Sequence, residues 1–575
     1  MYDYGVKMDF KSKIASLLSE EIKEISKDDI EKILEVPPDK NMGDLAFPCF
    51  KLSKIYRKSP MQIASDLAGK IQKPDFVSEI KQLSGYLNFF IDNNTIIKQT
   101  IHKVLKEQTD YMKGEPKGKT VIVEYSSPNI AKPFHIGHVR TTVIGNALYN
   151  IYKFAGYDVV GINHLGDYGT QFGKLIVAYK KWGDKEELKK APIKTLLKLY
   201  VKFHEEAEKD PTLEDMARAE FKKLEDGDEN AKRLWEVFRE ESLNEFSKVY
   251  KMLLIHFDSY AGESFYQDKM SAVIQQLKDK NLLMESQNAH VVDLEKFGLG
   301  VALIQKSDGS SLYLTRDIAT AIYRMNTYNF YKCLYVVGSQ QSLHFNQLKK
   351  IIELMGYTKE KGYGEIVHVQ FGMVSLEEGT IATRKGRVVF LEDVLNNAIK
   401  KTRTIIEEKN PNLKNIDQLA KQIGVGAVVF QELSNSRTKD YMFSMDKTLS
   451  FEGETGPYVQ YTHARACSVL RKSGKTDFSD ASCESLAQND DAVSIVKIIA
   501  SYGEVIERTI SRNEPHHIAR YMLDLSQAFN RFYHSTPILT GDQKEKNDKL
   551  ALTKAVALAL ESTLKLFNMS SPDEM

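Results

Sequence analysis

Residues 121–169, VIVEYSSPNIAKPFHIGHVRTTVIGNALYNIYKFAGYDVVGINHLGDYG, carry the strongest structural signal in the chain. Val121 to Tyr125 is an apolar run of the kind found in strands, and the Ser, Pro and Asn of residues 126–133 favour a turn. From Ile136 to Ile151 apolar residues recur at three-and-four spacing, which predicts one face of a helix. A second strand-like run, Asp158 to Asn163, follows. The pattern predicts a strand, helix, strand unit of a parallel sheet.

The helix of this unit begins at the four residues His135-Ile136-Gly137-His138. In parallel units the ligand lies beyond the carboxyl end of the strand, where free N–H groups at the helix start favour phosphate oxygens. Two histidines three positions apart can face one triphosphate, and the glycine between them leaves room for a purine. The chemistry indicated is attack on the α-phosphate of ATP. Because four residues alone are a weak motif, the rest of the chain has to support this hypothesis.

The surrounding sequence resembles the first signature of class I aminoacyl-tRNA synthetases, and the flank SSPNIAKPFHIGHVR is similar to the arginyl-tRNA synthetase version. The resemblance implies a multidomain α/β protein. It would have a Rossmann-like parallel-sheet catalytic domain, an N-terminal α/β tRNA-binding domain and a C-terminal all-α anticodon-binding domain. The implied activity is arginine–tRNA ligation through arginyl-adenylate, with activation dependent on bound tRNA. A catalytically inactive RNA-binding scaffold descended from such an enzyme is the alternative.

Length and composition are compatible with this hypothesis. A chain of 575 residues predicts several domains, and 42% hydrophobic with 27% charged residues is typical of a soluble folded protein. The net charge is +1, so nucleic acid has to be held by local patches. The four cysteines lack C-x-x-C spacing, which predicts reduced thiols and no zinc site. Without a leader or a membrane-length apolar run, we expect a cytoplasmic monomer that does not bind membranes.

Four units are expected along the chain. The charged segment inside the catalytic unit alternates in sign at helical spacing, which is typical of a solvated helical surface. The last helix of the chain, Leu550 to Phe567, is predicted to be amphipathic. The predicted units are an N-terminal tRNA-binding domain (1–112), a catalytic domain (113–400) with a helical insertion at about 180–250, a helical connection (401–453) and a helical anticodon-binding domain (454–575).

Tyr313 and Asp317 are four positions apart in SSLYLTRDIATAIYR. If Asp317 lies in the first turn of a helix, both can face one pocket. A carboxylate suits a guanidinium because it accepts a bidentate pair of N–H bonds. A core tyrosine and a carboxylate at a helix start are the structural alternative. The resemblance implies that both bind L-arginine, and it implies four further arginine ligands: Glu124, Ser127, Asn129 and Gln341. The alternative is a turn role for Ser127 and Asn129 and a surface position at a helix start for Gln341.

The second class I signature is degenerate in this chain. In the class, a lysine-rich loop neutralises the charge that develops on the triphosphate. The corresponding residues, Thr380 to Arg384 in FGMVSLEEGTIATRKGRVVF, lack even the first lysine. The remaining cations are Arg384, expected to bind ATP with His135, Gly137 and His138, and Lys385 and Lys132, expected to act catalytically with the two histidines. Mg²⁺ bridging the phosphates is implied, and a solvated basic loop is the alternative for Arg384 and Lys385.

Aromatic and polar residues in the two flanking domains are candidates for tRNA contacts. Rings stack on splayed bases, and arginine and amide groups donate to phosphates and base edges. Core positions are the alternative, because aromatic residues at helical or strand spacing are usually buried. The candidates are Asn88 in GYLNFFI of the first unit and Tyr458, Arg465, Asn530 and Tyr533 in the last.

Overall fold

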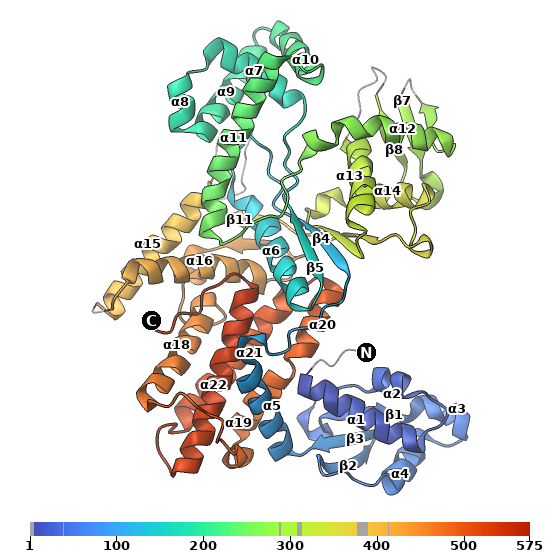
Figure 1. Ribbon diagram of the computed structural model, residues 1–575, viewed down its shortest axis with the longest axis vertical. Helices are drawn as coiled ribbons and strands as arrows, with labels where there is room; N and C mark the ends of the chain where they lie inside the picture. Colours follow the sequence, from blue (N-terminus) through green and yellow to red (C-terminus); the bar gives the residue numbers. More distant parts are fainter. Residues whose placement is uncertain (1–4, 38, 287–288, 307–312, 377–388, 412) are drawn as a thin grey trace.

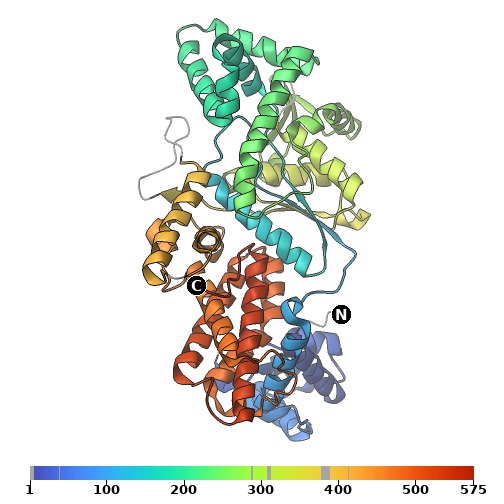
Figure 2. The same ribbon diagram turned by 60° about the vertical axis from the view of Figure 1, so that its left-hand side comes forward.

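The computed structural model describes residues 5–37, 39–286, 289–306, 313–376, 389–411 and 413–575. The molecule is elongated, with a helical insertion at one end and the N-terminal and C-terminal domains side by side at the other (Figure 1). A parallel sheet lies between the two ends. The view turned about the long axis has the same arrangement (Figure 2).

The catalytic domain is built on a four-stranded parallel sheet with the order β10-β9-β4-β5. The chain runs from β4 to β5 on one side of β4 and later returns to β9 on the other side, so the strand order reverses between β4 and β9. Ligands of open parallel sheets bind at the carboxyl end of such a switch point. The strands are β4 (Thr120–Glu124), β5 (Asp158–Ile162), β9 (Lys332–Tyr335) and β10 (Glu365–His368).

Strand β4 is buried on both faces because helices cover both sides of the sheet. Val121 and Val123 belong to the core shared with α6 (Val139–Phe154), whereas Ile122 faces the core under α12, α13 and α14. A 3₁₀ turn, η4 (Ile136–His138), leads into α6. The predicted strand, helix, strand unit is therefore confirmed. Almost every side chain of α6 is buried, since α16, α20 and α22 cover the side away from the sheet.

Two further groups of elements complete the catalytic domain. The first group, helices α7 to α11, contains the predicted insertion at about 180–250 and lies at the upper end of Figure 1. The second group packs on the other face of the sheet around a small antiparallel sheet, β6-β7-β8. The elements are α7 (Thr170–Trp182), α8 (Lys185–Lys190), α9 (Pro192–Ala207), α10 (Thr212–Glu225), α11 (Glu229–Met252), η5 (Glu263–Lys269), α12 (Met270–Asp279), β6 (Met284–Ser286), β7 (Ala289–Asp293), β8 (Val301–Gln305), α13 (Tyr313–Tyr328), η7 (Ser339–Gln341) and α14 (Ser342–Leu354).

The N-terminal domain is a three-stranded antiparallel sheet with the order β1-β3-β2, covered by helices. Its last helix, α5, leaves this domain and packs against α19 and α22 of the C-terminal domain (Figure 1). The two flanking domains are thereby joined. The elements are α1 (Gly5–Glu21), α2 (Lys27–Ile33), β1 (Leu45–Pro48), α3 (Ser53–Tyr56), α4 (Pro60–Lys70), β2 (Val77–Leu83), β3 (Tyr86–Ile91) and α5 (Asn93–Glu107).

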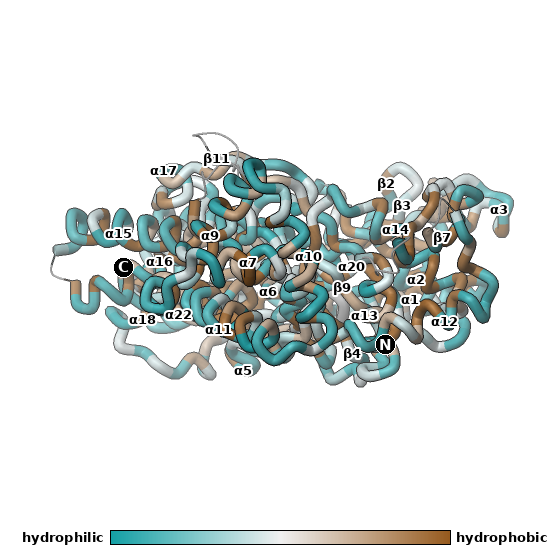
Figure 3. The backbone as a smooth tube through the Cα atoms, turned by 90° about the horizontal axis from the view of Figure 1, so that it is seen from above, coloured by the Kyte–Doolittle hydropathy of each residue, from teal (hydrophilic) through white to brown (hydrophobic). Residues whose placement is uncertain are grey.

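A connecting region and a helical bundle form the rest of the chain. Hydrophilic and hydrophobic segments alternate along most helices (Figure 3), as expected where one face is solvated. Within the described residues, no helix is both long and apolar enough to cross a membrane. The elements are β11 (Val374–Leu376), α15 (Leu391–Lys409), α16 (Ile416–Ser434), β12 (Tyr441–Phe443), α17 (Met445–Thr448), α18 (Gly456–Ser473), α19 (Asp490–Ala500), α20 (Tyr502–Arg512), α21 (His516–Ser535) and α22 (Gln543–Leu566).

The predicted last helix has only a narrow polar stripe. Helix α22 is buried on most sides, because α5, α18, α19 and α21 pack around it, and within 550–567 the charged residues Lys554, Glu561 and Lys565 keep part of their exposure. Its buried charges are hydrogen-bonded: Asp548 accepts from the backbone N–H of Cys483 at 2.8 Å, and Lys549 donates to the carbonyl of Pro537 at 2.8 Å. Buried charges with such partners are tolerated in a protein interior.

Candidate active site

The carboxyl end of β4 places Glu124 at the switch point, where it pairs with Ile162 of β5 and Tyr335 of β9. Glu124 is 6% exposed, and its Oε2 lies 2.5 Å from Nη1 of Arg324, a fully buried residue of α13. This ion pair fixes α13 against β4. An ammonium bound here would have to share the carboxylate with Arg324.

The turn after β4 holds two consecutive serines with left-handed backbone, Ser126 (φ 69°) and Ser127 (φ 46°). This conformation costs a non-glycine residue of order 1–3 kcal/mol and is concentrated at functional sites. Three hydrogen bonds maintain it. The Ser127 N–H donates to Oδ1 of Asn163 at 3.1 Å, while the hydroxyl of Tyr250 lies 2.8 Å from the Ser126 hydroxyl and accepts from the Asn163 amide at 3.0 Å.

Asn129 is exposed beside this turn and forms an isolated parallel bridge with Gly166. A Cβ at position 166 would lie 2.2 Å from Oδ1 of Asn129, so only glycine permits this approach. Ser127 and Asn129 therefore lie together at the carboxyl edge of the sheet, on the β4 side of the switch point.

The two histidines contact each other at the start of α6, with ring centroids 4.0 Å apart. Nδ1 of His135 accepts from the Gly137 N–H, and Nδ1 of His138 accepts from the His135 N–H, both at 3.1 Å. These bonds assign the proton of each neutral ring to Nε2. A Cβ at Gly137 would lie 2.8 Å from the His135 ring, which explains the glycine between them.

Burial keeps both imidazoles neutral. It lowers the pKa of His135, and burial with the nearby His135 and Lys132 lowers the pKa of His138 to about 3. The ring of His138 also stacks on Phe134, with centroids 5.1 Å apart. The pair therefore offers hydrogen-bond donors rather than positive charge at neutral pH.

The residues that follow the second class I signature are hydrogen-bonded to the residues of the first signature. The Ile136 N–H donates to the Val389 carbonyl at 3.1 Å, and the Leu391 N–H donates to the Phe134 carbonyl at 3.0 Å. Arg384 and Lys385 themselves lie outside the described residues. Lys132 is half-buried near His138. Val389 and Leu391 thus contact the chain on either side of His135.

The other side of the site is formed by α13 and α14. Among the described residues helix α13 begins at Tyr313, so Tyr313 and Asp317 are its first and fifth residues and lie about one turn apart. Tyr313 is 64% exposed, and the Asp317 side chain is about a quarter exposed. Gln341 is exposed at the end of η7, immediately before α14. These three side chains come from neighbouring elements on the β9 side of the switch point.

Sequence reasoning missed two ionisable residues near Asp317. Nε2 of His344, on α14, lies 2.6 Å from Oδ2 of Asp317. Oε2 of Glu263, on η5, lies 3.2 Å from Nη1 of Arg316, and burial raises the pKa of Glu263 to about 7 although Arg316 opposes the shift. The sequence held one sign of His344: it follows the predicted ligand Gln341 by three residues, about one helical turn. It held no sign of Glu263, because η5 is far from Asp317 along the chain.

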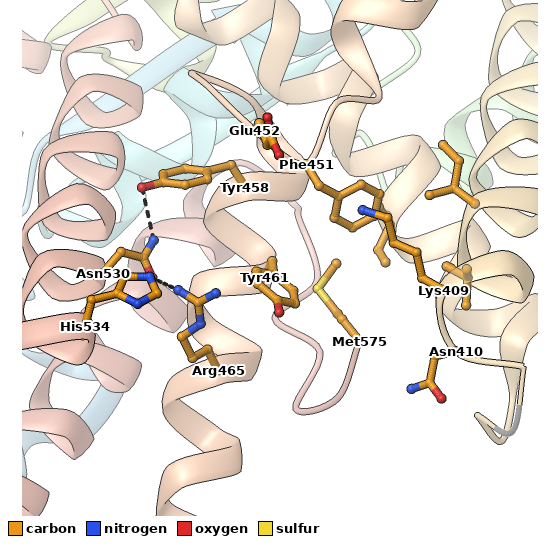
Figure 4. Close-up of a pocket in the computed structure, with 13 residues that line it drawn as sticks. Lys409, Asn410, Phe451, Glu452, Tyr458, Tyr461, Arg465, Asn530, His534 and Met575 are labelled. Atoms are coloured by element: carbon orange, nitrogen blue, oxygen red, sulfur yellow. Dashed lines mark hydrogen bonds between the residues drawn. The ribbon is translucent and has the colours of Figure 1, made fainter. Parts of the chain in front are cut away.

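A separate cavity of about 530 Å³ lies between the C-terminal bundle and the connecting helices (Figure 4). It brings together Tyr458, Arg465 and Asn530 of the predicted RNA contacts. The Arg465 guanidinium lies 4.9 Å from the ring centroids of both Tyr461 and Tyr533, and Asn530 donates to the Tyr458 hydroxyl at 3.0 Å. Arg465 also donates to the Asn530 side chain. Lys409, Asn410, Phe451 and the terminal Met575 complete the rim.

Asn88 does not belong to an accessible surface. It lies in the centre of β3, is 2% exposed, and packs in the core of the N-terminal domain. The core alternative holds for this residue, because β3 is the middle strand of its sheet.

One group of possible metal ligands occurs among the described residues: His463, Cys467 and Asp573, whose donor atoms lie within 4.8 Å of one another. Nδ1 of His463 lies 3.1 Å from the Pro572 carbonyl. Structural zinc sites use four protein ligands. This group supplies three, and we assign it no metal.

The parallel sheet with His-Ile-Gly-His at its switch point is the architecture of a class I aminoacyl-tRNA synthetase. The family model described as "tRNA synthetases class I (R), catalytic domain" matches residues 100–445. Models described as "Arginyl tRNA synthetase N terminal domain" and "DALR anticodon binding domain" match residues 12–91 and 459–575.

Curated relatives match along the whole chain. An arginine–tRNA ligase of Clostridioides difficile (strain 630) is 59% identical over 568 residues, covering 99% of this chain and 100% of the relative. One from Halothermothrix orenii is 54% identical over 569 residues with the same coverage. The chain belongs to the arginyl-tRNA synthetases.

Solved structures share the fold. The arginyl-tRNA synthetase of Thermus thermophilus superimposes with a TM-score of 0.83 at 23% identity, covering 99% of this chain and 100% of that one. The structure from Plasmodium falciparum gives a TM-score of 0.82 at 24% identity, covering 100% of both chains. The predicted multidomain α/β fold, with its Rossmann-like catalytic domain and helical C-terminal domain, is confirmed.

Proposed function

We propose that this chain activates L-arginine with ATP and transfers it to the 3′ end of a cognate tRNA. The observation that carries the proposal is the match to arginine–tRNA ligases over the entire chain, with the two histidines at the sheet's switch point. The arginine carboxylate attacks the α-phosphate, giving arginyl-adenylate and pyrophosphate. A terminal ribose hydroxyl of the tRNA then attacks the adenylate carbonyl.

The ATP site in this proposal lies over η4 and the start of α6. Nε2–H of His135 and of His138 would donate to phosphate oxygens, since their Nδ1 atoms accept from the backbone. Because both rings are neutral, positive charge has to come from Lys132, Arg384 and Lys385. Mg²⁺ on the ATP phosphates would add further charge. No general base is required, because a carboxylate is already ionised at neutral pH.

Arginine would bind across the switch point, between the ends of β4 and β9. Asp317 would accept from the guanidinium, flanked by Tyr313 and Gln341. A carboxylate is the acceptor that best matches a planar guanidinium. The α-amino and α-carboxylate groups would lie near the opposite wall, formed by Glu124, Ser127 and Asn129. This placement directs the arginine carboxylate toward the histidines at the start of α6.

For the tRNA, we propose that the cavity of Figure 4 receives a nucleotide of the anticodon loop. Tyr458, Arg465 and Asn530 line it and supply a ring, a guanidinium and an amide of the kind that bind single-stranded bases. We propose that Tyr533, whose ring centroid lies 4.9 Å from the Arg465 guanidinium, contacts the same loop from outside the cavity lining. We retain the division into units at 1–112, 113–400, 401–453 and 454–575 as part of the proposal. A cytoplasmic monomer remains our expectation.

Arginine-dependent exchange between ATP and pyrophosphate tests the activity. Exchange is expected only when an arginine-accepting tRNA is present, because we propose that bound tRNA completes the site. The measurement is radiolabel incorporation into ATP with and without that tRNA. Lysine and a non-cognate tRNA are the controls. Binding of tRNA without exchange under either condition would favour the inactive scaffold and contradict our proposal.

Replacing Arg465 by alanine should raise the KM for tRNA about fivefold to 150-fold, since stacking on one base contributes about 1–3 kcal/mol. The KM for arginine should stay at the wild-type value. The measurement is aminoacylation at varied tRNA concentration. Arg520→Ala is the matched control, because Arg520 lies on α21 in the same domain and pairs with Glu454 at 2.7 Å. An unchanged tRNA KM in Arg465→Ala would remove this residue from the interface.

A further inference from the structure

The Asp317 carboxylate is held by a neighbouring helix. Nε2 of His344 lies 2.6 Å from Oδ2 of Asp317, and both side chains are about a quarter exposed. The contact joins α13 to α14, which lie side by side in Figure 1. Distances this short are typical of hydrogen bonds to a charged group.

The packing of α13 against α14 fixes this contact in advance of any ligand. Ile318 and Ile322 of α13 share one core with Phe345 and Leu348 of α14. The Phe345 ring, adjacent to His344 in sequence, packs on Tyr335 at a centroid distance of 5.2 Å. A functional group is well positioned when packed elements hold its supporting partner. The position of the imidazole is therefore set by the core and not by the solvent-exposed edge.

We propose that His344 is a positioning residue for arginine recognition: it holds the Asp317 carboxylate in the orientation that accepts two N–H bonds from the substrate guanidinium. This inference rests on the proposed function of Asp317. The terminal torsion of an aspartate is broad, so a partly exposed carboxylate rotates unless a partner holds it. A carboxylate has about four acceptor sites. His344 uses one of them on Oδ2 and leaves both oxygens able to accept from a guanidinium.

The hydrogen bond of His344 can be tested apart from its ring. Glutamine is the matched substitution, because its Nε2 amide donates at a similar reach, whereas alanine removes the donor.

The test compares His344→Ala and His344→Gln with the wild-type chain in aminoacylation at saturating ATP and tRNA. His344→Ala should raise the KM for arginine about tenfold to a hundredfold, the effect expected for a lost hydrogen bond to a charged group. The kcat and the KM for ATP should change little. His344→Gln should keep the arginine KM close to that of the wild type, because the amide supplies the lost donor.

The matched control is His368→Gln. The His368 ring stacks on Phe345 at 4.5 Å, and its Nε2 bonds to the Val337 carbonyl, so it shares the cluster without touching Asp317. Its arginine KM should equal that of the wild type. An arginine KM in His344→Ala equal to the wild type would overturn the inference, as would equal losses in the alanine and glutamine variants. If the wild-type chain itself fails to charge tRNA with arginine, the proposed function fails instead.

Discussion

Asp317→Ala should lower kcat/KM for arginine by about a hundredfold to ten-thousandfold. Each hydrogen bond to a charged group contributes about 1.5–3 kcal/mol, and a guanidinium can donate two to this carboxylate. About 1.4 kcal/mol corresponds to a factor of ten. The loss should appear in the arginine KM, while the KM for ATP stays the same. Initial rates of aminoacylation at varied arginine concentration provide the measurement.

Asp317→Asn separates charge from shape in this prediction. It keeps the size of the side chain and one acceptor oxygen, so its loss should lie between those of the wild type and the alanine variant. Circular dichroism should be unchanged in both variants, since the Asp317 side chain is only partly buried. Arginine kinetics like those of the wild type in Asp317→Ala would show that the guanidinium binds elsewhere.

His138→Ala should lower kcat for activation by about a hundredfold to a thousandfold, the cost of removing one donor aimed at charge that develops in the transition state. The neutral ring presents Nε2–H, because its Nδ1 accepts from the His135 backbone at 3.1 Å. The KM for arginine should be little affected, because His138 lies on the opposite side of the switch point from Asp317. Single-turnover formation of arginyl-adenylate in the presence of tRNA gives the relevant rate.

The control for His138 is His204→Ala on α9, a histidine of the insertion whose ring contacts Tyr200 at 4.6 Å. It should activate arginine at the wild-type rate. In the wild-type chain the neutral His138 ring should keep donating through Nε2–H when the pH is lowered. Its pKa is lowered to about 3, so the ring stays neutral well below pH 6.5. A wild-type rate in His138→Ala would exclude this ring from contact with the phosphates.

Patterns within a short stretch of sequence predicted the strands and helices whose formation depends mainly on neighbouring residues. The run from Val121 to Tyr125 and the periodic residues up to Ile151 gave β4 and α6 within a few residues of their bounds. Such patterns predicted less where a distant segment changed the environment. Leu550 to Phe567 keeps only a narrow exposed stripe, since α5, from the other end of the chain, packs against this helix as well.

Some residues of the candidate site could be predicted from the sequence, and others could not. The residues within one segment, His135, Gly137 and His138, were predictable because a helix start places them together. The partner of Asp317 was not, because His344 follows it by 27 positions and a strand intervenes. Asn88 was misplaced since strand periodicity alone cannot tell that β3 is the central strand of its sheet.

The sequence by itself therefore determined the class of fold, the family and the residues at the end of β4, because short-range spacing and turn chemistry specify a strand, a helix and their junction. Only the tertiary structure decided which ionisable groups lie in contact. Two such contacts join segments that are remote along the chain: Arg324 with Glu124, and His344 with Asp317. The neutral state of His138 likewise depends on its burial. Desolvation and packing set these properties, and both are effects of the assembled core.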